Sequence, residues 1–144
     1  MTDLAAYWLL LGSAFLSATL LPGSSEAVLI GLLATSSLQP ATLVVVASVG
    51  NVAGATLNWA LGRFFVAYQD RGWFPVSAAA MIRAQSWFAR FGLWTLLLAW
   101  VPVIGDPLTV VAGILRVPFW RFFVLVGTGK VLRYALVVYV WQHL

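Results

Sequence analysis

The stretch Leu21-Pro22-Gly23-Ser24-Ser25-Glu26 interrupts a long apolar run and places an acidic residue directly after the interruption. Pro and Gly end helices, Ser is a preferred N-cap, and a carboxylate in the first turn of a helix is favoured by the helix dipole. Residues 4–21 before the break and residues 27–38 after it carry no charge. The stretch therefore predicts a hairpin of two apolar helices, with Pro22 at the break and Glu26 opening the second helix.

Composition indicates that lipid is the solvent of this chain. Of its 144 residues, 62% are apolar and 8% are charged, whereas a soluble domain has about 25% charged residues. The net charge of +4 is too sparse to predict a nucleic-acid partner. Cysteine is absent from the sequence, which excludes disulfides, thiolate catalysis and cysteine metal sites. We expect an all-α integral membrane protein with a single membrane domain, residues 1–144.

Pro40 divides the uncharged run that follows Glu26. As a helix, residues 26–38 extend only about 20 Å, which is too short to cross a hydrocarbon core of about 30 Å. Residues 41–62 extend about 33 Å and can cross it. The first half therefore predicts a re-entrant helical hairpin followed by one spanning helix.

The spacing between Pro22 and Glu26 returns in the second half as Pro102 and Asp106. Short apolar arms flank this second break, and a further Pro precedes residues 119–142, which can span about 36 Å as a helix. The shared order of arm, break, acid, arm, Pro and spanning helix predicts an internal repeat.

The distribution of arginine predicts how the repeats are oriented. If the short arms re-enter, each repeat (about residues 4–62 and 91–143) crosses the membrane once, so the two repeats are inverted relative to each other. The linker, residues 63–90, carries four arginines and is therefore expected in the cytoplasm. Both termini are then expected on the opposite side.

Within the linker, residues 77–90 place apolar and basic side chains on different sides of a helix. This pattern is typical of an amphipathic helix at the membrane interface. A simple solvated linker is the alternative. The apolar side chains are Met81, Trp87 and Phe88.

Four charged residues fall inside the apolar segments: Glu26 and Asp106 at the hairpin tips, and Lys130 and Arg133 in the last spanning segment. Charges in hydrocarbon are costly and usually functional. Lys130 and Arg133 are three residues apart and share one helix face. Two interpretations stay open. One is a static buried ion-pair cluster, and the other is a midplane site where an acid exchanges a proton and the cations meet an anionic headgroup, phosphate or small anion.

Asn51 and Asn58 lie on the first spanning segment among small residues such as Gly50. Small residues permit close helix contact, and Asn can form hydrogen bonds across it. Packing is therefore the expected role of Asn51 and Asn58. Pro22 and Pro102, which break the two hairpins, are grouped with Asn51 and Asn58 as residues with a packing or secondary role.

The sequence offers little for an enzyme. His143 is the only histidine and stands beside the last residue, so it cannot act as a buried catalytic base. We find no phosphate-binding Gly loop and no spacing typical of metal ligands in the sequence. We expect neither catalysis, nor a cofactor, nor a metal.

Several ordered motifs are similar to one membrane protein family. Leu21 to Glu26, Gly50-Asn51 through Gly62-Arg63, Pro102 to Gly113, and Gly129-Lys130-x-x-Arg133-Tyr134 resemble the YqaA branch of the DedA family, within the wider VTT, or SNARE-associated, membrane proteins. The likeness covers nearly the whole chain. It implies an inner-membrane protein with paired re-entrant hairpins, in a family implicated in moving polyprenyl phosphate and phospholipids with proton coupling.

The resemblance also implies roles for single residues. Glu26 matches the acid after the first hairpin break, and Gly62-Arg63 matches the Gly-Arg pair that closes the first spanning helix. Lys130 and Arg133 are candidates to replace cations that the family carries elsewhere. The chain departs from the family pattern, which has an acid or arginine at these positions, at Ala55, Ala99 and Gly105.

These observations together predict a translocase, with proton coupling as an option, that moves a phospholipid, polyprenyl phosphate or small anion across a bacterial inner membrane. The alternative is a structural or accessory membrane protein that transports nothing. Membrane lipids, protons and a second copy of the chain are the expected partners. The central loop is expected in the cytoplasm and both termini in the periplasm.

Overall fold

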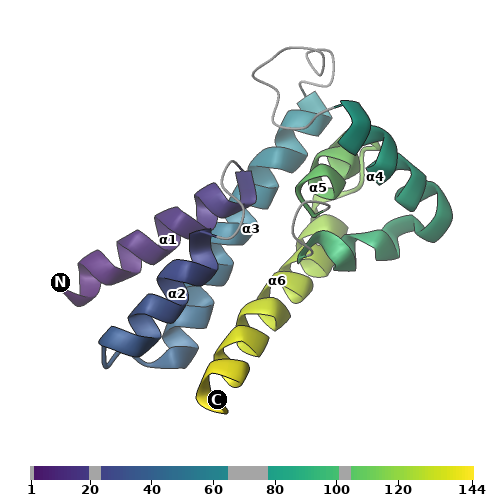
Figure 1. Ribbon diagram of the computed structural model, residues 1–144. Helices are drawn as coiled ribbons and strands as arrows, with labels where there is room; N and C mark the ends of the chain where they lie inside the picture. The colour runs from purple at the N-terminus through teal and green to yellow at the C-terminus, as the bar shows by residue number, and fades with distance from the viewer. Residues whose placement is uncertain (1, 20–23, 65–77, 101–104) are drawn as a thin grey trace.

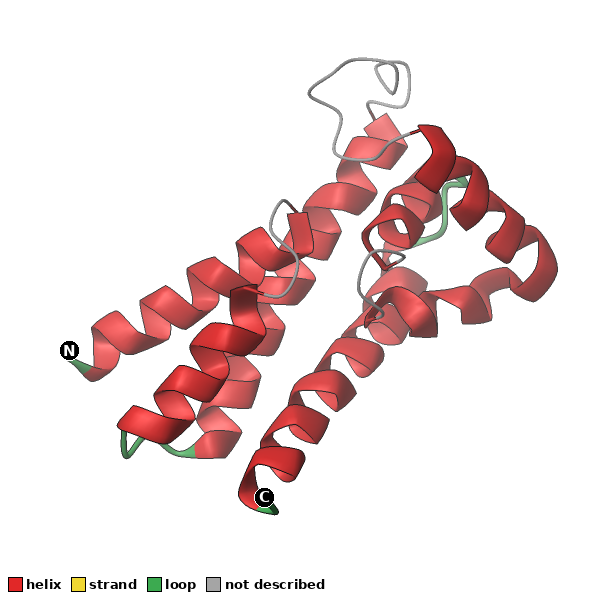
Figure 2. Cartoon of the chain, viewed as in Figure 1, coloured by secondary structure: helices red, strands yellow, loops and turns green. Residues whose placement is uncertain are grey.

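The computed structural model describes residues 2–19, 24–64, 78–100 and 105–144, except for the side chains of residues 19, 24, 98–100, 105 and 106. Figure 2 shows that all regular structure in these ranges is helical. Two helices, α3 (Pro40–Phe64) and α6 (Phe119–Gln142), are long and apolar enough to cross a bilayer. The expectation of an all-α chain with two candidate spans is confirmed.

Shorter helices precede each of these two. In the first half they are α1 (Asp3–Thr19) and α2 (Ser24–Thr35). In the second half they are η2 (Gly92–Trp100), a 3₁₀ helix, and α5 (Gly105–Ile114). The longest, α1, rises about 26 Å, less than a hydrocarbon core of about 30 Å. The bounds of α1 and α2 agree to within three residues with the predicted arms, residues 4–21 and 26–38. Pro22 and Pro102, the predicted breaks, lie outside the described residues.

Helix α3 is the centre of the fold, with α1, α5 and α6 packed around it (Figure 1). Two glycines of α3 allow close contacts with neighbouring helices. Gly50 lies against the backbone of Leu11 in α1, and Gly62 lies against the backbone of Val110 in α5. Because glycine has no Cβ, helix backbones can approach at these points more closely than any other residue would permit.

Helix α6 runs antiparallel to α3 and also packs on η2. At the α6 N-terminal end, the ring of Trp59 lies 5.5 Å from Phe119 and 6.1 Å from Phe122. Both termini therefore lie toward one end of the bundle, and α4 (Ala78–Phe91) lies toward the other, as Figure 1 shows.

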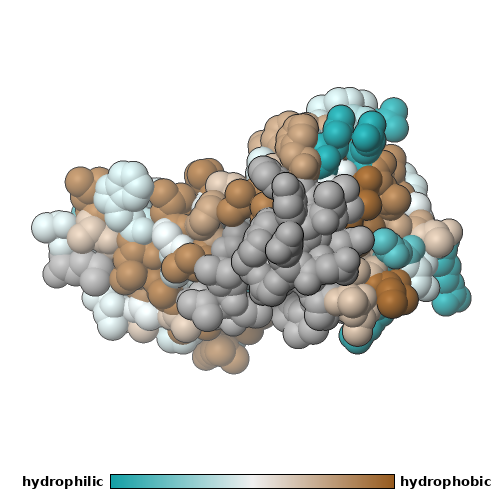
Figure 3. Space-filling model, turned by 90° about the horizontal axis from the view of Figure 1, so that it is seen from above, coloured by the Kyte–Doolittle hydropathy of each residue, from teal (hydrophilic) through white to brown (hydrophobic). Residues whose placement is uncertain are grey.

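Helix α4 packs on the protein rather than lying free. Its Met81, Ala84 and Phe88 are buried against α5 and η2, while Arg83 and Arg90 on the other side of the helix are exposed. The alternative of a simple solvated linker is therefore wrong for residues 78–91, because burial of three apolar side chains holds this helix in place. Figure 3, which views the molecule from the α4 end, shows hydrophilic residues gathered on the α4 side.

Candidate functional site

A layer of buried polar residues separates two apolar clusters. On α3, Ser48 and Asn51 lie between Ala47 of one cluster and Ala55 of the other. On α6, Lys130 occupies the corresponding place, between Val126 of one cluster and Tyr134 of the other. Positions 51 and 130 are both near the middle of their helices. The polar layer is therefore at mid-depth if α3 and α6 span the membrane.

An ion pair joins the start of α2 to α6 across this layer. Glu26 lies in the first turn of α2, where the exposed backbone N–H groups favour a carboxylate. Its Oε1 pairs with an Nη atom of Arg133. The Glu26 side chain is 20% exposed and that of Arg133 is 15% exposed, so both side chains lie near the edge of the buried layer, although Oε1 of Glu26 itself is buried. The start of α2 therefore places a carboxylate against an arginine near the middle of α6, a candidate membrane span.

A second contact beside the ion pair uses the neighbours of the same two residues. The Ser25 hydroxyl donates to Glu26 Oε2 at 3.3 Å and lies 2.8 Å from the phenolic oxygen of Tyr134, which is then the donor to Ser25. Ser25 and Tyr134 are fully buried. A chain of hydrogen bonds thus links Tyr134 of α6 through Ser25 to Glu26 of α2. The ion pair then links Glu26 to Arg133, the neighbour of Tyr134 on α6.

Ser25 and Tyr134 are members of this site that sequence reasoning did not assign to it. A signal was present, because each is adjacent in sequence to a residue that was predicted for the site. Ser25 was in the N-capping stretch, and Tyr134 was in the motif that supported the family resemblance. Their mutual contact joins residues 109 positions apart, so only the packing of α2 on α6 reveals it.

The structure describes one of the other two predicted site residues in full and the other only in its backbone. Lys130 is buried on α6, one turn before Arg133. Asp106 lies in the first turn of α5, as Glu26 does in α2, but its side chain is outside the described part of the structure. The structure therefore brings Glu26 and Arg133 together and leaves the partner of Asp106 as a prediction.

Asn51 and Asn58 connect α3 to its neighbours. The Asn51 side-chain amide donates to the backbone carbonyl of Ala14 in α1 at 2.9 Å. The Asn58 amide donates to the carbonyl of Ala18 at 2.8 Å and to the hydroxyl of Thr109 in α5 at 3.2 Å. Both side chains are buried, and both bind helices rather than the ion pair. Their geometry is that of interhelical hydrogen bonds.

Opposite charges dominate the described site. Lys130 and Arg133 put two positive charges within one turn of α6, and Glu26 pairs with the second of them. An anion that enters this region can compete with Glu26 for Arg133.

Comparison with known families defines the class of protein. The VTT domain model matches residues 21–143, which contain both candidate spans and the ion pair. The chain therefore belongs to the VTT-domain, or DedA, family of membrane proteins.

Relatives give a closer likeness. The chain is 39% identical over 137 residues to "Inner membrane protein YqaA" of Escherichia coli (strain K12), which covers 95% of this chain and 92% of that protein. The protein of the same name from Shigella flexneri matches equally well. A Haemophilus influenzae protein is 31% identical over 134 residues, 88% of this chain and 82% of its own. The names support a bacterial inner membrane as the location. No solved structure matches the chain.

Proposed function

We propose that this protein is a translocase that moves a phospholipid, polyprenyl phosphate or small anion across the inner membrane, with the Glu26–Arg133 pair as its exchange site. The observation that supports the proposal is the position of this pair. It joins the tip of a short helix to the middle of a spanning helix, and it keeps partial exposure of both side chains. Ion pairs at this depth are costly, and in membrane proteins they usually mark a pathway.

Competition for Arg133 is the proposed mechanism. In the resting state Glu26 holds Arg133, and the Tyr134–Ser25 hydrogen bonds hold the Glu26 carboxylate in place. A phosphate or other anion replaces Glu26 on Arg133, with Lys130 adding a second positive charge. Glu26 takes up a proton as it is displaced, which couples anion movement to proton movement. No bond in the substrate is made or broken, so the proposed activity is transport and not catalysis.

The competing proposal is that the pair is static and only holds α2 on α6. The two proposals differ in the consequence of replacing both charges by apolar side chains. A buried ion pair can often be exchanged for well-packed apolar residues at little or no cost in stability. The double variant Glu26→Leu/Arg133→Met therefore stays folded under either proposal, but only a static pair leaves the activity of the protein intact.

The experiment is transport by the purified protein in liposomes. Movement of labelled phospholipid, polyprenyl phosphate or a small anion is followed with and without a pH gradient. We expect wild type to transport one of these ligands, and Glu26→Gln, Asp106→Asn and the double variant to lose at least tenfold in rate. Arg83→Gln is the matched control, because it removes an exposed arginine of α4. A wild-type protein that moves none of them, or a folded double variant that transports normally, would overturn the proposal.

We further propose that the two halves are inverted repeats whose short helices re-enter the membrane. In support, each half has two short helices before a long one, and both termini lie at one end of the bundle (Figure 1). The α4 end is proposed to be cytoplasmic and the termini periplasmic, in line with the positive-inside rule. Because the sequence lacks cysteine, single thiols introduced at Thr2, Arg83 and Leu144 can be labelled with impermeant reagents. Labelling of position 2 or 144 from the cytoplasm would contradict this topology.

A second copy of the chain is proposed to complete the path, because two spanning helices enclose little volume by themselves. The mass of the protein in detergent and the order of its chemical cross-links in liposomes test this point. A monomer that transports at the full rate would contradict it.

A further inference from the structure

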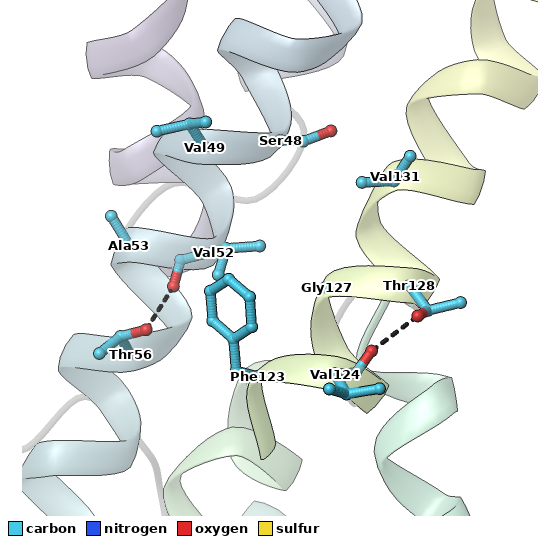
Figure 4. Close-up of a pocket in the computed structure, with 10 residues that line it drawn as sticks. All are labelled: Ser48, Val49, Val52, Ala53, Thr56, Phe123, Val124, Gly127, Thr128 and Val131. Atoms are coloured by element: carbon cyan, nitrogen blue, oxygen red, sulfur yellow. Dashed lines mark hydrogen bonds between the residues drawn. The ribbon is translucent and has the colours of Figure 1, made fainter. Parts of the chain in front are cut away.

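A cavity of about 600 Å³ opens between the two spanning helices, away from the ion pair. One wall is α3 and the other is α6, as Figure 4 shows. The volume falls in the range of about 300–1,000 Å³ that is usual for ligand sites. Four of the lining side chains are also about half exposed, so the cavity opens on the outer surface of the bundle: Val49, Phe123, Val124 and Val131.

The wall of this cavity is almost entirely apolar. Two lining hydroxyls bind carbonyls of their own helices: Thr56 donates to Val52 at 2.8 Å, and Thr128 donates to Val124 at 2.7 Å (Figure 4). Both residues therefore contribute little polarity to the space. Ser48, at the end nearest the termini, has a hydroxyl without a hydrogen-bond partner among the described residues. Apart from Ser48, the wall suits a hydrocarbon ligand.

Gly127 leaves room for that ligand. A methyl group added at Gly127 would meet no atom within 4 Å, although the residue is in the wall of the cavity. At Gly50 and Gly62, in contrast, the missing side chain is replaced by the backbone of a neighbouring helix. The space at Gly127 is thus not filled by any described part of this chain.

The cavity occupies most of the depth of one leaflet, because its lining on α6 extends from Phe123 to Val131, about 12 Å of helix rise. It begins near Val131, close to the middle of α6, and extends along the helix toward its N-terminal end. Arg121 is ten residues before Val131, which corresponds to about 15 Å of helix rise. Half of a bilayer core of about 30 Å is the same distance.

Arginines gather at the end toward which the cavity extends. The Trp59 indole donates to the Val117 carbonyl at 3.0 Å, which fixes the α5–α6 connection against α3. Arg116 is next to this carbonyl, and Arg121 is one turn further along the chain. Arg63 is one turn after Trp59 on α3, and its backbone meets α5 at Gly113. Arg116 and Arg121 are exposed and Arg63 is partly exposed.

We infer that the α3–α6 cavity binds one acyl chain of an anionic phospholipid, whose headgroup phosphate lies at Arg63, Arg116 and Arg121. An apolar slot that extends from mid-depth toward basic side chains at the headgroup level complements such a lipid in both shape and charge. The lipid belongs to the leaflet on the α4 side. Binding does not require that the protein transport, so a failed transport assay would leave this inference standing.

The test measures lipid binding by the intact protein in detergent. Native mass spectrometry gives the affinity for dioleoyl phosphatidylglycerol and, for comparison, dioleoyl phosphatidylcholine. We expect phosphatidylglycerol to bind at least tenfold more tightly. Arg63→Gln and Arg121→Gln should each weaken phosphatidylglycerol about fivefold, whereas Arg83→Gln, on the exposed side of α4, should leave its affinity unchanged.

Gly127→Leu tests the cavity itself. The added side chain enters the slot and should weaken both lipids at least tenfold, while helix content and thermal unfolding stay as in wild type. Gly12→Leu is the matched control, because Gly12 is exposed on α1 and also has open space around it. Equal binding of lipid by the two leucine variants would overturn the inference. So would a cavity occupied by a second copy, which would appear as a dimer that Gly127→Leu disrupts and that carries no lipid.

Discussion

Gly62 of α3 and Gly113 of α5 interlock where the backbones of the two helices meet. A methyl group on Gly62 would overlap the backbone carbonyl oxygen of Val110, and one on Gly113 would overlap that of Trp59. The contact is reciprocal, since each glycine lies against the backbone of the opposite helix. It anchors α5 to the first spanning helix, even though α5 precedes the second one in the chain.

Gly62→Ala and Gly113→Ala are therefore expected to push the helices apart and destabilise the protein by about 2 kcal/mol or more. A backbone carbonyl cannot rotate away as a flexible side chain can. Gly31→Ala is the matched control, because no atom lies within 4 Å of its added methyl group, and it should be neutral or raise stability by up to about 1 kcal/mol. Thermal unfolding in detergent, followed by circular dichroism, measures the difference. Equal stability of the three variants would show that the contact is looser than described.

Tyr134→Phe removes the hydroxyl that binds Ser25 but keeps the aromatic ring in the core. The loss of one hydrogen bond between buried groups is expected to cost about 1 kcal/mol. Tyr139→Phe makes the same chemical change at an exposed position on the same helix and should leave the free energy of unfolding unchanged. Unfolding free energies of the two variants give the comparison. If Tyr134→Phe is as stable as Tyr139→Phe, the Tyr134 hydroxyl does not form the hydrogen bond assigned to it in this site.

Asn58→Ala is expected to loosen two helices, because the Asn58 amide donates to α1 and to α5. Asn51→Ala should loosen α1 alone, since Asn51 donates only to Ala14 among the described residues. Interhelical hydrogen bonds in membrane proteins are worth about 0.6 kcal/mol on average, so Asn58→Ala should cost about twice as much as Asn51→Ala. Hydrogen exchange resolved by helix is the measurement. Faster exchange of α5 in Asn51→Ala, or unchanged α5 in Asn58→Ala, would contradict the assignment.

Arg116→Gly is expected to raise stability. Arg116 follows α5 with a φ of 60°, a left-handed conformation that favours glycine. The amides of Arg116 and Val117 donate back to Gly113 and Ala112, both at 3.0 Å, in a Schellman cap. Relief of the backbone cost should give about 1 kcal/mol.

Arg116→Ala separates this backbone effect from loss of the charge. Alanine removes the guanidinium group but keeps the unfavourable φ, so it should give no gain in stability. The two variants are compared by chemical unfolding in detergent. If alanine and glycine stabilise the protein equally, the charge and not the backbone conformation is responsible.

Much of the helical architecture was predictable from local sequence signals. Proline at position 40 begins α3, as predicted from its inability to continue a helix. The α6 bounds, Phe119–Gln142, agree with the predicted segment because an apolar run after Pro118 has no other interruption. Length alone then separates α3 and α6 from the short helices, since the helix rise per residue is constant.

The site was predictable only as a set of candidates. Charged residues in an apolar chain are conspicuous, so Glu26 and Arg133 could be selected from composition and position. Their pairing could not, because Lys130 is also on the α6 face that was predicted and has the same charge. Whether Glu26 pairs with Lys130 or with Arg133 depends on the rotation of α6 and on the depth at which α2 begins. Neither property can be predicted from the local sequence.

The sequence by itself thus determined that the protein belongs in a membrane, where its helices begin and end, and which residues carry charge into the apolar segments. These properties depend on transfer free energy and on local backbone geometry, to which each residue contributes separately. Only the tertiary structure decided that Arg133 holds Glu26, that Tyr134 reaches Ser25, and that the spanning helices leave a cavity at Gly127. Those features depend on how helices distant in sequence rotate and cross, and that is set by the packing of all of them together.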